Sequence, residues 1–305
     1  MSATIRVRVP GSTANLGSGF DCLGIAVNRW VRLAVRRGSG AGAVALERRG
    51  ALAGLDVPAE RDLLYQGFAR ACRAGGQEPP GGLVMEVESD IPVGRGLGSS
   101  AAAVVAGAVA ARALLGLVLA DQALIELSAD IEGHPDNVAP SVRGGAVLAL
   151  SGPAGGLVLA PIEIHASLEL VFAVPDFALA TERARAVLPA SVPQSTAVTA
   201  AARSAALVVG LARADAALLR AGLDDVLHVP HRRALVRGYD AVTAAATAAG
   251  AFGATLSGSG STLVAVAPTD RAGAVEAAMT QAWRATGVQA QSFRLADAVP
   301  GYEVS

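Results

Sequence analysis

Hydrophobic and polar residues alternate at the start of the chain and take up a helical period soon afterwards. Ile5, Val7 and Val9 are separated by arginines, and this period of two is typical of a strand with one buried face. Residues 27–35 also read as strand. In residues 59–74 the apolar side chains recur at helical spacing, which predicts an amphipathic helix. The chain therefore opens with β structure followed by a helix.

The same two periods predict the remaining elements. In the first half they give strands at 83–87 and 145–150 and helices at 99–115 and 121–132. In the second half they give strands at 168–174, 251–257, 262–267 and 289–295 and helices at 180–188, 196–214, 239–249 and 271–286. Strands and helices mix without the strict alternation of a parallel doubly wound sheet, so we expect an α+β fold.

The length of 305 residues predicts two domains that share one core or cleft. Residues 151–156 combine Gly, Pro and Ser, which is typical of a boundary between domains. We therefore expect an N-terminal domain at 1–153 and a C-terminal domain at 154–305 that closes the cleft.

Composition narrows the class of partner. All 25 basic residues are arginine and the net charge is -1, whereas proteins that bind nucleic acid or anionic membranes concentrate a basic excess. We expect neither partner. Two cysteines without CxxC spacing, and a start without the apolar core of a signal peptide, favour a cytoplasmic protein. Residues 101–120 are apolar, but Arg112 and the many alanines favour a buried helix over a membrane span.

The segment at residues 92–102 is the most informative in the chain. It reads PVGRGLGSSAA, with glycines at alternate positions before two serines that begin a helix. Glycines let backbone N–H groups point into one concavity, and the first N–H groups of a helix lack partners within it, so the segment predicts an anion cradle. A glycine-rich connector with a serine cap is the alternative interpretation. The chain has neither the lysine of a Walker loop nor the GxGxxG spacing of a dinucleotide fold.

Three segments, in this order, resemble the GHMP kinases, the family of galactokinase and mevalonate kinase. They are residues 10–21 (PGSTANLGSGFD), 92–102 and 256–261 (LSGSGS). The resemblance implies a two-domain fold, with an N-terminal half like domain 2 of ribosomal protein S5 and a ferredoxin-like C-terminal half. It also implies a kinase that uses ATP and Mg²⁺ to phosphorylate the hydroxyl of a small molecule.

Further segments are similar to the branch of this family that phosphorylates L-homoserine. They are STANLGSGFD, residues 132–140 (EGHPDNVAP), residues 181–189 (TERARAVLP) and residues 225–232 (DVLHVPHR). The similarity implies transfer of the γ-phosphate of ATP to L-homoserine, giving O-phospho-L-homoserine for threonine biosynthesis. Ala180, Val226 and His231 depart from the pattern of that branch beside the expected substrate contacts, so they bear on fine specificity rather than on the reaction.

The resemblance also implies a role for individual residues. The ATP phosphates are expected at Pro92, Val93, Gly94, Arg95, Gly96, Leu97, Gly98, Ser99, Ser100, Ala101 and Ala102, with Gly258, Ser259 and Gly260. Glu132 and a hydroxyl of Ser99 or Ser100 are expected to hold Mg²⁺, since a hard cation prefers oxygen ligands. The expected catalytic set is Glu132, Ser100 and Asn137. The substrate is expected at Asn15, Asp21, His134, Asp136, Asn137, Arg185 and Arg232.

The charges of this set fit the implied substrate. A zwitterionic amino acid needs a carboxylate for its ammonium group and a guanidinium for its carboxylate. Asp21 can be the first, and Arg185 or Arg232 the second. A loose transition state places little early demand on the attacking hydroxyl to lose its proton, and the chain has no lysine to assist an aspartate. We therefore expect catalysis without a dedicated general base.

Two other functions stay open from the sequence. A GHMP kinase for mevalonate or a sugar would share the glycine loop, and a silent member that senses an amino acid or a nucleotide would share the fold. A silent member is expected to have lost Glu132 or a loop glycine, and neither is lost. His228 and His231 are interpreted as surface or structural residues rather than metal ligands, and Cys22 as a small hydrophobe. A homodimer is compatible with the sequence.

Overall fold

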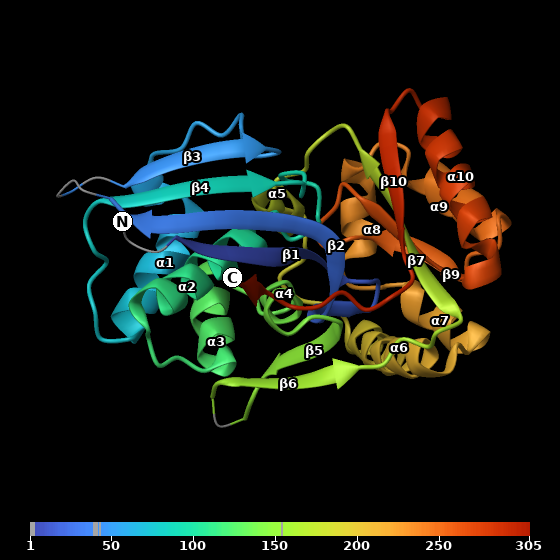
Figure 1. The fold of residues 1–305 in the computed structure, drawn as a ribbon. Coiled ribbons are helices and arrows are strands. Elements are labelled where there is room, and N and C mark those ends of the chain that lie inside the picture. The colour runs from blue at the N-terminus through green and yellow to red at the C-terminus, as the bar shows by residue number, and fades with distance from the viewer. Residues whose placement is uncertain (1–3, 39–41, 43, 154) are drawn as a thin grey trace.

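The computed structural model describes residues 4–38, 42, 44–153 and 155–305. It contains two sheets, one built mainly from each half of the chain, with helices packed against them (Figure 1). The predicted α+β class is confirmed. The first half forms β1 (Ile5–Asn15), β2 (Gly19–Arg37), β3 (Ala45–Gly50), a 3-10 turn (Ala59–Arg61), α1 (Leu63–Ala74), β4 (Leu83–Ser89), α2 (Ser99–Leu115), α3 (Asp121–Glu132), α4 (Val138–Arg143), β5 (Ala146–Ser151) and β6 (Leu157–Ile162).

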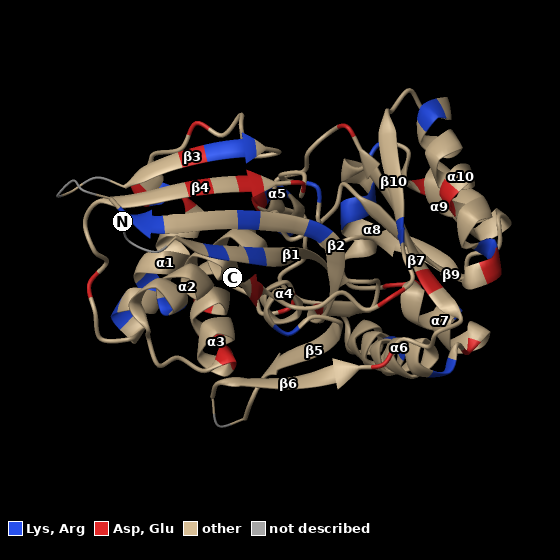
Figure 2. Cartoon of the chain, in the orientation of Figure 1, with Lys and Arg blue, Asp and Glu red and all other residues tan. Residues whose placement is uncertain are grey.

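The larger sheet has seven strands. Its main path runs β11-β1-β2-β4-β3, while β5 pairs with β2 and β6 with β5; β3 and β4 are parallel and the other pairs antiparallel. Val9 opposite Val31 is buried, whereas Arg8 opposite Arg32 is exposed, so side chains alternate between the core and solvent. Figure 2 shows arginine and acidic segments on neighbouring strands β1 to β4 of this sheet.

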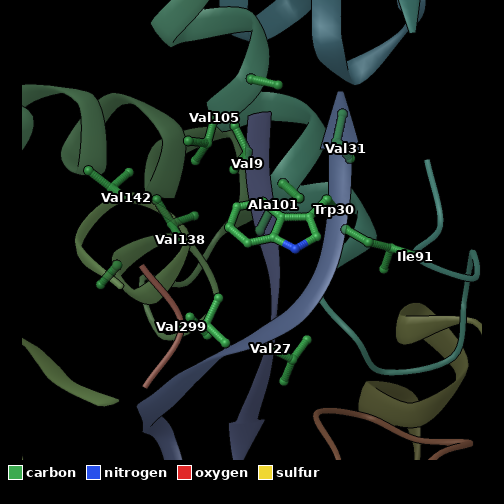
Figure 3. Packing of buried hydrophobic residues seen from close by; sticks show 14 of the residues in the cluster. Val9, Val27, Trp30, Val31, Ile91, Ala101, Val105, Val138, Val142 and Val299 are labelled. Carbon is green, nitrogen blue, oxygen red and sulfur yellow. The ribbon is translucent and has the colours of Figure 1, made fainter. Parts of the chain in front are cut away.

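Helices α1 to α4 cover the other face of this sheet and form the main core with it (Figure 1). Trp30 of β2 packs among Val9, Ala101, Val105 and Val138 (Figure 3). Full burial of a valine or leucine side chain stabilises a fold by about 1.5–3 kcal/mol. Nearly every turn of α2 is buried, which confirms the predicted interior helix and explains its alanines, since small side chains allow close packing on several sides.

The second half forms β7 (Leu168–Pro175), α5 (Thr181–Ala186), α6 (Gln194–Arg213), α7 (Ala216–Leu223), α8 (Val229–Arg232), a 3-10 turn (Arg233–Leu235), α9 (Tyr239–Ala248), β8 (Gly253–Leu256), β9 (Leu263–Pro268), α10 (Thr269–Ala285), β10 (Ala290–Leu295) and β11 (Glu303–Val304). Its antiparallel sheet has the order β10-β7-β9-β8. With α9 and α10 packed against it, the chain order β7, α9, β8, β9, α10, β10 is the ferredoxin-like βαββαβ arrangement. The expected ferredoxin-like half is therefore confirmed.

The second half of the chain contributes two strands to the sheet of the first half. Residue 154, where the second domain was expected to begin, lies outside the described residues. Beyond it, β6 pairs with β5 and the short β11 pairs with β1. Both strands thus belong to the first sheet, so the division into 1–153 and 154–305 stays a proposal and the sheets themselves do not follow it.

Helices α5 to α8 are inserted between β7 and α9 and carry two of the expected arginines. Among helices in the described part of the chain, α6 alone is long and apolar enough to cross a membrane by length and composition, and 22% of its apolar window is buried. At 17 residues, α2 is shorter.

Candidate active site

The glycine-rich loop leads from β4 into the N-terminus of α2. Its glycines have positive φ values, such as 71° at Gly96 and 67° at Gly98. A Cβ atom on Gly96 would lie 2.1 Å from the carbonyl oxygen of Ser257, and one on Gly98 would lie 2.2 Å from Oγ of Ser12. Glycine is therefore required at both positions. The loop ends where the first N–H groups of α2 lack partners within the helix, an arrangement that binds anions.

Three loops that are distant in sequence meet beside this helix. Ser257 Oγ lies 2.6 Å from the carbonyl oxygen of Gly96 and 2.8 Å from Thr13 Oγ1. A hydroxyl has one proton, so Ser257 donates to the carbonyl and accepts from Thr13. Asn15 Nδ2 donates to the carbonyl oxygen of Gly258 at 2.8 Å. The segments at 10–21, 92–102 and 256–261 therefore form one cluster.

A carboxylate and a hydroxyl face each other at the start of α2. Ser100 Oγ donates to Glu132 Oε2 at 2.7 Å, which joins the first turn of α2 to the last residue of α3. Burial raises the pKa of Glu132, and the hydrogen bond from Ser100 only partly opposes this shift. A cation would favour the ionised form, and two oxygen donors suit a hard cation such as Mg²⁺. Of the two candidate serines, Ser100 makes the contact with Glu132.

The loop between α3 and α4 carries a connected polar group. His134 Nδ1 lies 2.6 Å from Asp136 Oδ1, and Asn137 Nδ2 donates to the same oxygen at 3.3 Å. Burial by itself lowers the pKa of His134, but the hydrogen bond and the charge of Asp136 outweigh it, so the pKa is raised. Ser12 Oγ lies 2.9 Å from Asn137 Oδ1 and 3.0 Å from the Asn137 carbonyl oxygen. The amide of Asn137 is therefore held in one orientation.

Opposite charges meet where the two halves of the chain face each other. Arg185 of α5 donates from Nη2 to Asp21 Oδ1 at 3.0 Å and from Nη1 to Oδ2 at 3.2 Å. Arg232 is buried, with 1% of its surface exposed, and burial followed by the charge of Arg185 lowers its pKa. Two guanidinium groups and one carboxylate carry a net charge of +1. The cluster can therefore bind an anionic group while offering Asp21 to a cationic one.

Two predicted site residues hold loops together in this structure. Asn15 Oδ1 accepts from the backbone N–H of Asp21 at 2.9 Å, so both ends of this amide contact protein. Arg95 donates to the carbonyl oxygens of Pro175 and Asp176, the latter at 3.0 Å, which ties the glycine loop to the end of β7. Direct contacts of Asn15 and Arg95 with substrates stay predictions.

Several residues of this region were not assigned a role from the sequence. Ser12 orients Asn137, Thr13 and Ser257 join two loops, and His228 contacts Arg232. The available signal for Ser12 and Thr13 was two adjacent hydroxyl side chains at the end of a strand with a buried face, since buried polar groups need partners. His228 is fully buried whereas His231 is exposed, and no group of three or more potential His, Cys, Asp or Glu metal ligands occurs within the described residues.

Known proteins resemble this chain over nearly its whole length. The models for the N-terminal and C-terminal domains of GHMP kinases match residues 62–145 and 207–285. Homoserine kinase of Trichormus variabilis is 43% identical over 94% of both chains, and that of a Synechococcus species is 42% identical over 98% of this chain and 97% of its own. The crystal structure of homoserine kinase from Cytophaga hutchinsonii has a TM-score of 0.89 and 30% identity, covering 99% of this chain and 97% of its own.

Proposed function

The chain belongs to the GHMP kinase family, and we propose that within this family it acts as an ATP-dependent homoserine kinase. It transfers the γ-phosphate of ATP to the side-chain hydroxyl of L-homoserine and forms O-phospho-L-homoserine, a step of threonine biosynthesis. Two relatives that are more than 40% identical over nearly their full length bear this name. The structural observation that carries the proposal is the grouping of Asp21, Arg185 and Arg232.

The charged cluster explains why an amino acid is the acceptor. Asp21 binds the ammonium group, and the guanidinium groups of Arg185 and Arg232 bind the carboxylate, because a planar guanidinium matches a carboxylate in geometry and charge. In the structure Arg185 and Asp21 satisfy each other. A zwitterion can replace this ion pair without leaving either charge unpaired, whereas mevalonate, which lacks an ammonium group, would leave Asp21 without a cation.

The ATP phosphates lie over the glycine loop and the N-terminus of α2, at residues 92–102. This placement is supported by the positive φ values of the loop glycines and by the close approach of Gly258 and Gly260 to Gly96. Backbone N–H groups at such a site bind phosphate oxygens without any lysine. Ser259 completes the third motif at this side of the cluster.

Glu132 and Ser100 would hold Mg²⁺, which usually takes one or two carboxylates plus substrate phosphates in kinases. When bound there, the ion supplies neutralisation of the phosphate charge. The raised pKa of Glu132 supports this assignment, since a partly buried carboxylate gains from a cation. Ser99 is the less favoured ligand, because the contact with Glu132 is made by Ser100.

The loop at 134–137 orients the acceptor. Asn137 is an amide and cannot take a proton, and its orientation is set by Ser12 and Asp136. The Asp136 carboxylate is buried and already accepts from His134. The acceptor hydroxyl therefore keeps its proton until its bond to phosphorus is advanced, as a loose transition state permits.

The other readings of the fold are less well supported. A kinase for mevalonate or a sugar would not need two arginines beside an aspartate, and a silent sensor would not need the pairing of Glu132 with Ser100. We propose a cytoplasmic location as well, supported by two free cysteines. A homodimer stays a prediction.

A panel of acceptors tests the proposed function. ADP release is measured with ATP, Mg²⁺ and one of L-homoserine, mevalonate, galactose or shikimate. We expect turnover with L-homoserine at least 100 times above that with the others, a difference equivalent to about 2.7 kcal/mol. Comparable turnover with mevalonate or galactose would assign the protein to another branch. ATP binding without turnover on any acceptor would support the silent sensor.

A further inference from the structure

His228 is a fully buried imidazole directly behind the proposed acceptor site. Its Nδ1 lies 3.2 Å from Arg232 Nη1 and its Nε2 lies 3.1 Å from the carbonyl oxygen of Gly17. We propose that His228, as a neutral imidazole protonated on Nε2, is a positioning residue that sets the orientation of Arg232 for the substrate carboxylate. This proposal rests on the proposed function, because it assigns a purpose to an arginine of that acceptor site.

The two partners of the ring determine its tautomer. A carbonyl oxygen can only accept, so the proton of the ring is on Nε2 and is donated to Gly17. A guanidinium nitrogen can only donate, so Nδ1 is unprotonated and accepts from Arg232. Protonation of Nδ1 would bring two donors and two positive charges together. Burial and the charge of Arg232 both lower the pKa of His228, against the opposing effect of Asp225, in agreement with the neutral ring.

Arg232 needs such a partner because it is almost completely buried. Its Nε donates to the carbonyl oxygen of Ala184 at 3.0 Å, and its guanidinium lies 5.2 Å from the ring centre of Phe20. Together with the bond to His228, these contacts fix the position and the plane of the guanidinium. An arginine has five N–H donors, and the hydrogen bonds found within the described residues use Nε and Nη1. The two N–H groups of Nη2 and the second N–H of Nη1 therefore remain for a ligand.

The imidazole is itself held on several sides. Asp225 Oδ2 accepts from the backbone N–H groups of Leu227, His228 and Val229 and lies 3.8 Å from His228 Nε2. The ring stacks on Phe20, with centres 4.7 Å apart and planes at 17°. The bond to Gly17 joins the residue before α8 to the turn between β1 and β2, and β2 carries Asp21. One residue thus fixes the guanidinium relative to the carboxylate that receives the ammonium group.

Two amide substitutions separate the two functions of the ring. In His228→Asn the side-chain oxygen can occupy the place of Nδ1 and accept from Arg232. In His228→Gln the amide nitrogen can reach the place of Nε2 and donate to Gly17, but the acceptor at Nδ1 is lost. We expect His228→Gln to raise the homoserine KM about tenfold or more, the lower end of what a hydrogen bond to a charged group contributes, with little change in the ATP KM. The homoserine KM of His228→Asn should stay closer to that of the wild type. His165→Asn, at an exposed histidine in the segment between β6 and β7, is the matched control.

The results of these experiments test the role of His228 separately from the proposed function. Equal rises of the homoserine KM in both variants, or a rise in the ATP KM as well, would show that His228 only fills space, which would overturn the proposal. Nitrogen-15 NMR of the histidine rings in the full-length wild-type protein gives a test that needs no acceptor and no variant. A buried ring protonated on Nε2 alone at pH 7 supports the proposal, whereas a ring protonated on Nδ1 or on both nitrogens overturns it. Absence of turnover with L-homoserine would instead overturn the proposed function and leave the NMR test decisive for the geometry.

Discussion

Arg185 and Asp21 form a two-point ion pair between the halves of the chain, with N–O distances of 3.0 and 3.2 Å. Both side chains are more than one third exposed, so the pair is accessible and contributes little to stability in water. The pair matters because Arg185 offers a guanidinium to the carboxylate of an amino acid and Asp21 offers a carboxylate to its ammonium group. Binding of a zwitterion exchanges one ion pair for two.

Arg185→Leu should raise the homoserine KM by about 10- to 100-fold and leave the ATP KM nearly unchanged, because a hydrogen bond to a charged group contributes ~1.5–3 kcal/mol. Steady-state kinetics with each substrate varied in turn measures both constants. Arg183→Leu is the matched control, since Arg183 is an exposed residue of the same short helix. An equal loss of activity toward an alcohol that lacks a carboxylate would show that Arg185 does not bind the substrate carboxylate.

Glu132→Gln should abolish most turnover and yet leave the folded protein equally or more stable at pH 7. The pKa of Glu132 is raised in the folded state, so the native protein favours the protonated form. The contribution of this group to stability is therefore present below its ordinary pKa and is lost as the pH rises through the folded value. Glutamine has no charge to acquire, so the variant does not lose this stability as the pH rises, and its side-chain oxygen can still accept the hydrogen bond from Ser100.

Thermal unfolding of the metal-free protein between pH 5 and 8 checks this prediction. The Tm of Glu132→Gln should exceed that of the wild type by a margin that grows as the pH rises. Ser100→Ala removes the hydroxyl but keeps the carboxylate, so it should lower both turnover and stability. A variant Glu132→Gln that is clearly less stable than the wild type at pH 7 would argue against a partly buried, ionised carboxylate that destabilises the fold at this position.

Ser12→Ala should lower kcat and reduce stability by about 1 kcal/mol, because Ser12 holds the amide of Asn137 and a lost hydrogen bond of a buried group costs about this much. Ser128→Ala is the comparison, since Ser128 is equally buried but its hydroxyl has no hydrogen-bond partner within the described residues. Urea unfolding and kcat are measured for both variants. Similar behaviour of the two would mean that Ser12 fills space and does not orient Asn137.

The pH dependence of kcat should lack a steep acid limb between pH 6 and 8, because the proposed reaction uses no general base. A carboxylate base would titrate on the acid side and contribute roughly 10²–10⁴-fold to the rate. The structure leaves Asp136 buried and bonded to His134 at 2.6 Å, which favours an orienting role. The profile is measured for the wild type and for Asp136→Asn. An acidic pKa that disappears in the variant, with a thousandfold loss of rate and intact homoserine binding, would identify Asp136 as the base.

The sequence predicted the regular elements where a strong period extends over a buried face. The helices at 99–115 and 121–132 begin and end as predicted, since each is bounded by glycine, polar or extended residues. The long hairpin of β1 and β2 extends well beyond the predicted strands at 5–9 and 27–35. The inner end of β1 consists of small and polar residues that show no alternation, and it is a strand because it pairs with β2.

The elements that were missed are short or exposed. The edge strand β3 and the strand β6 have few buried side chains, so their sequences lack a hydrophobic face. Helix α4 has six residues and contains Pro140, and α7 follows α6 after a short break at Ala214 and Asp215. The prediction placed a single helix at 196–214, whereas α6 begins two residues earlier, after Pro193.

The motifs predicted which segments form one cluster, whereas the connections within this cluster were not predicted. The glycine loop can be recognised from the sequence because the spacing of its glycines is a local property. The contact of Ser12 with Asn137 joins residues 125 positions apart, and that of His228 with Gly17 joins residues 211 apart. Such pairs depend on how two halves of the chain fold together, which no local pattern contains. Which of Ser99 and Ser100 contacts Glu132 likewise depends on the hydroxyl that the first turn of α2 directs toward this carboxylate.

The central claim is that this chain phosphorylates the hydroxyl of L-homoserine. The most direct measurement follows the reaction of the purified protein with ATP, Mg²⁺ and L-homoserine by phosphorus-31 NMR. The account predicts a new phosphomonoester signal that grows in step with ADP, matches authentic O-phospho-L-homoserine and is absent with Glu132→Gln. ADP formed together with inorganic phosphate alone, or a phosphomonoester formed only when mevalonate or galactose replaces L-homoserine, would contradict it.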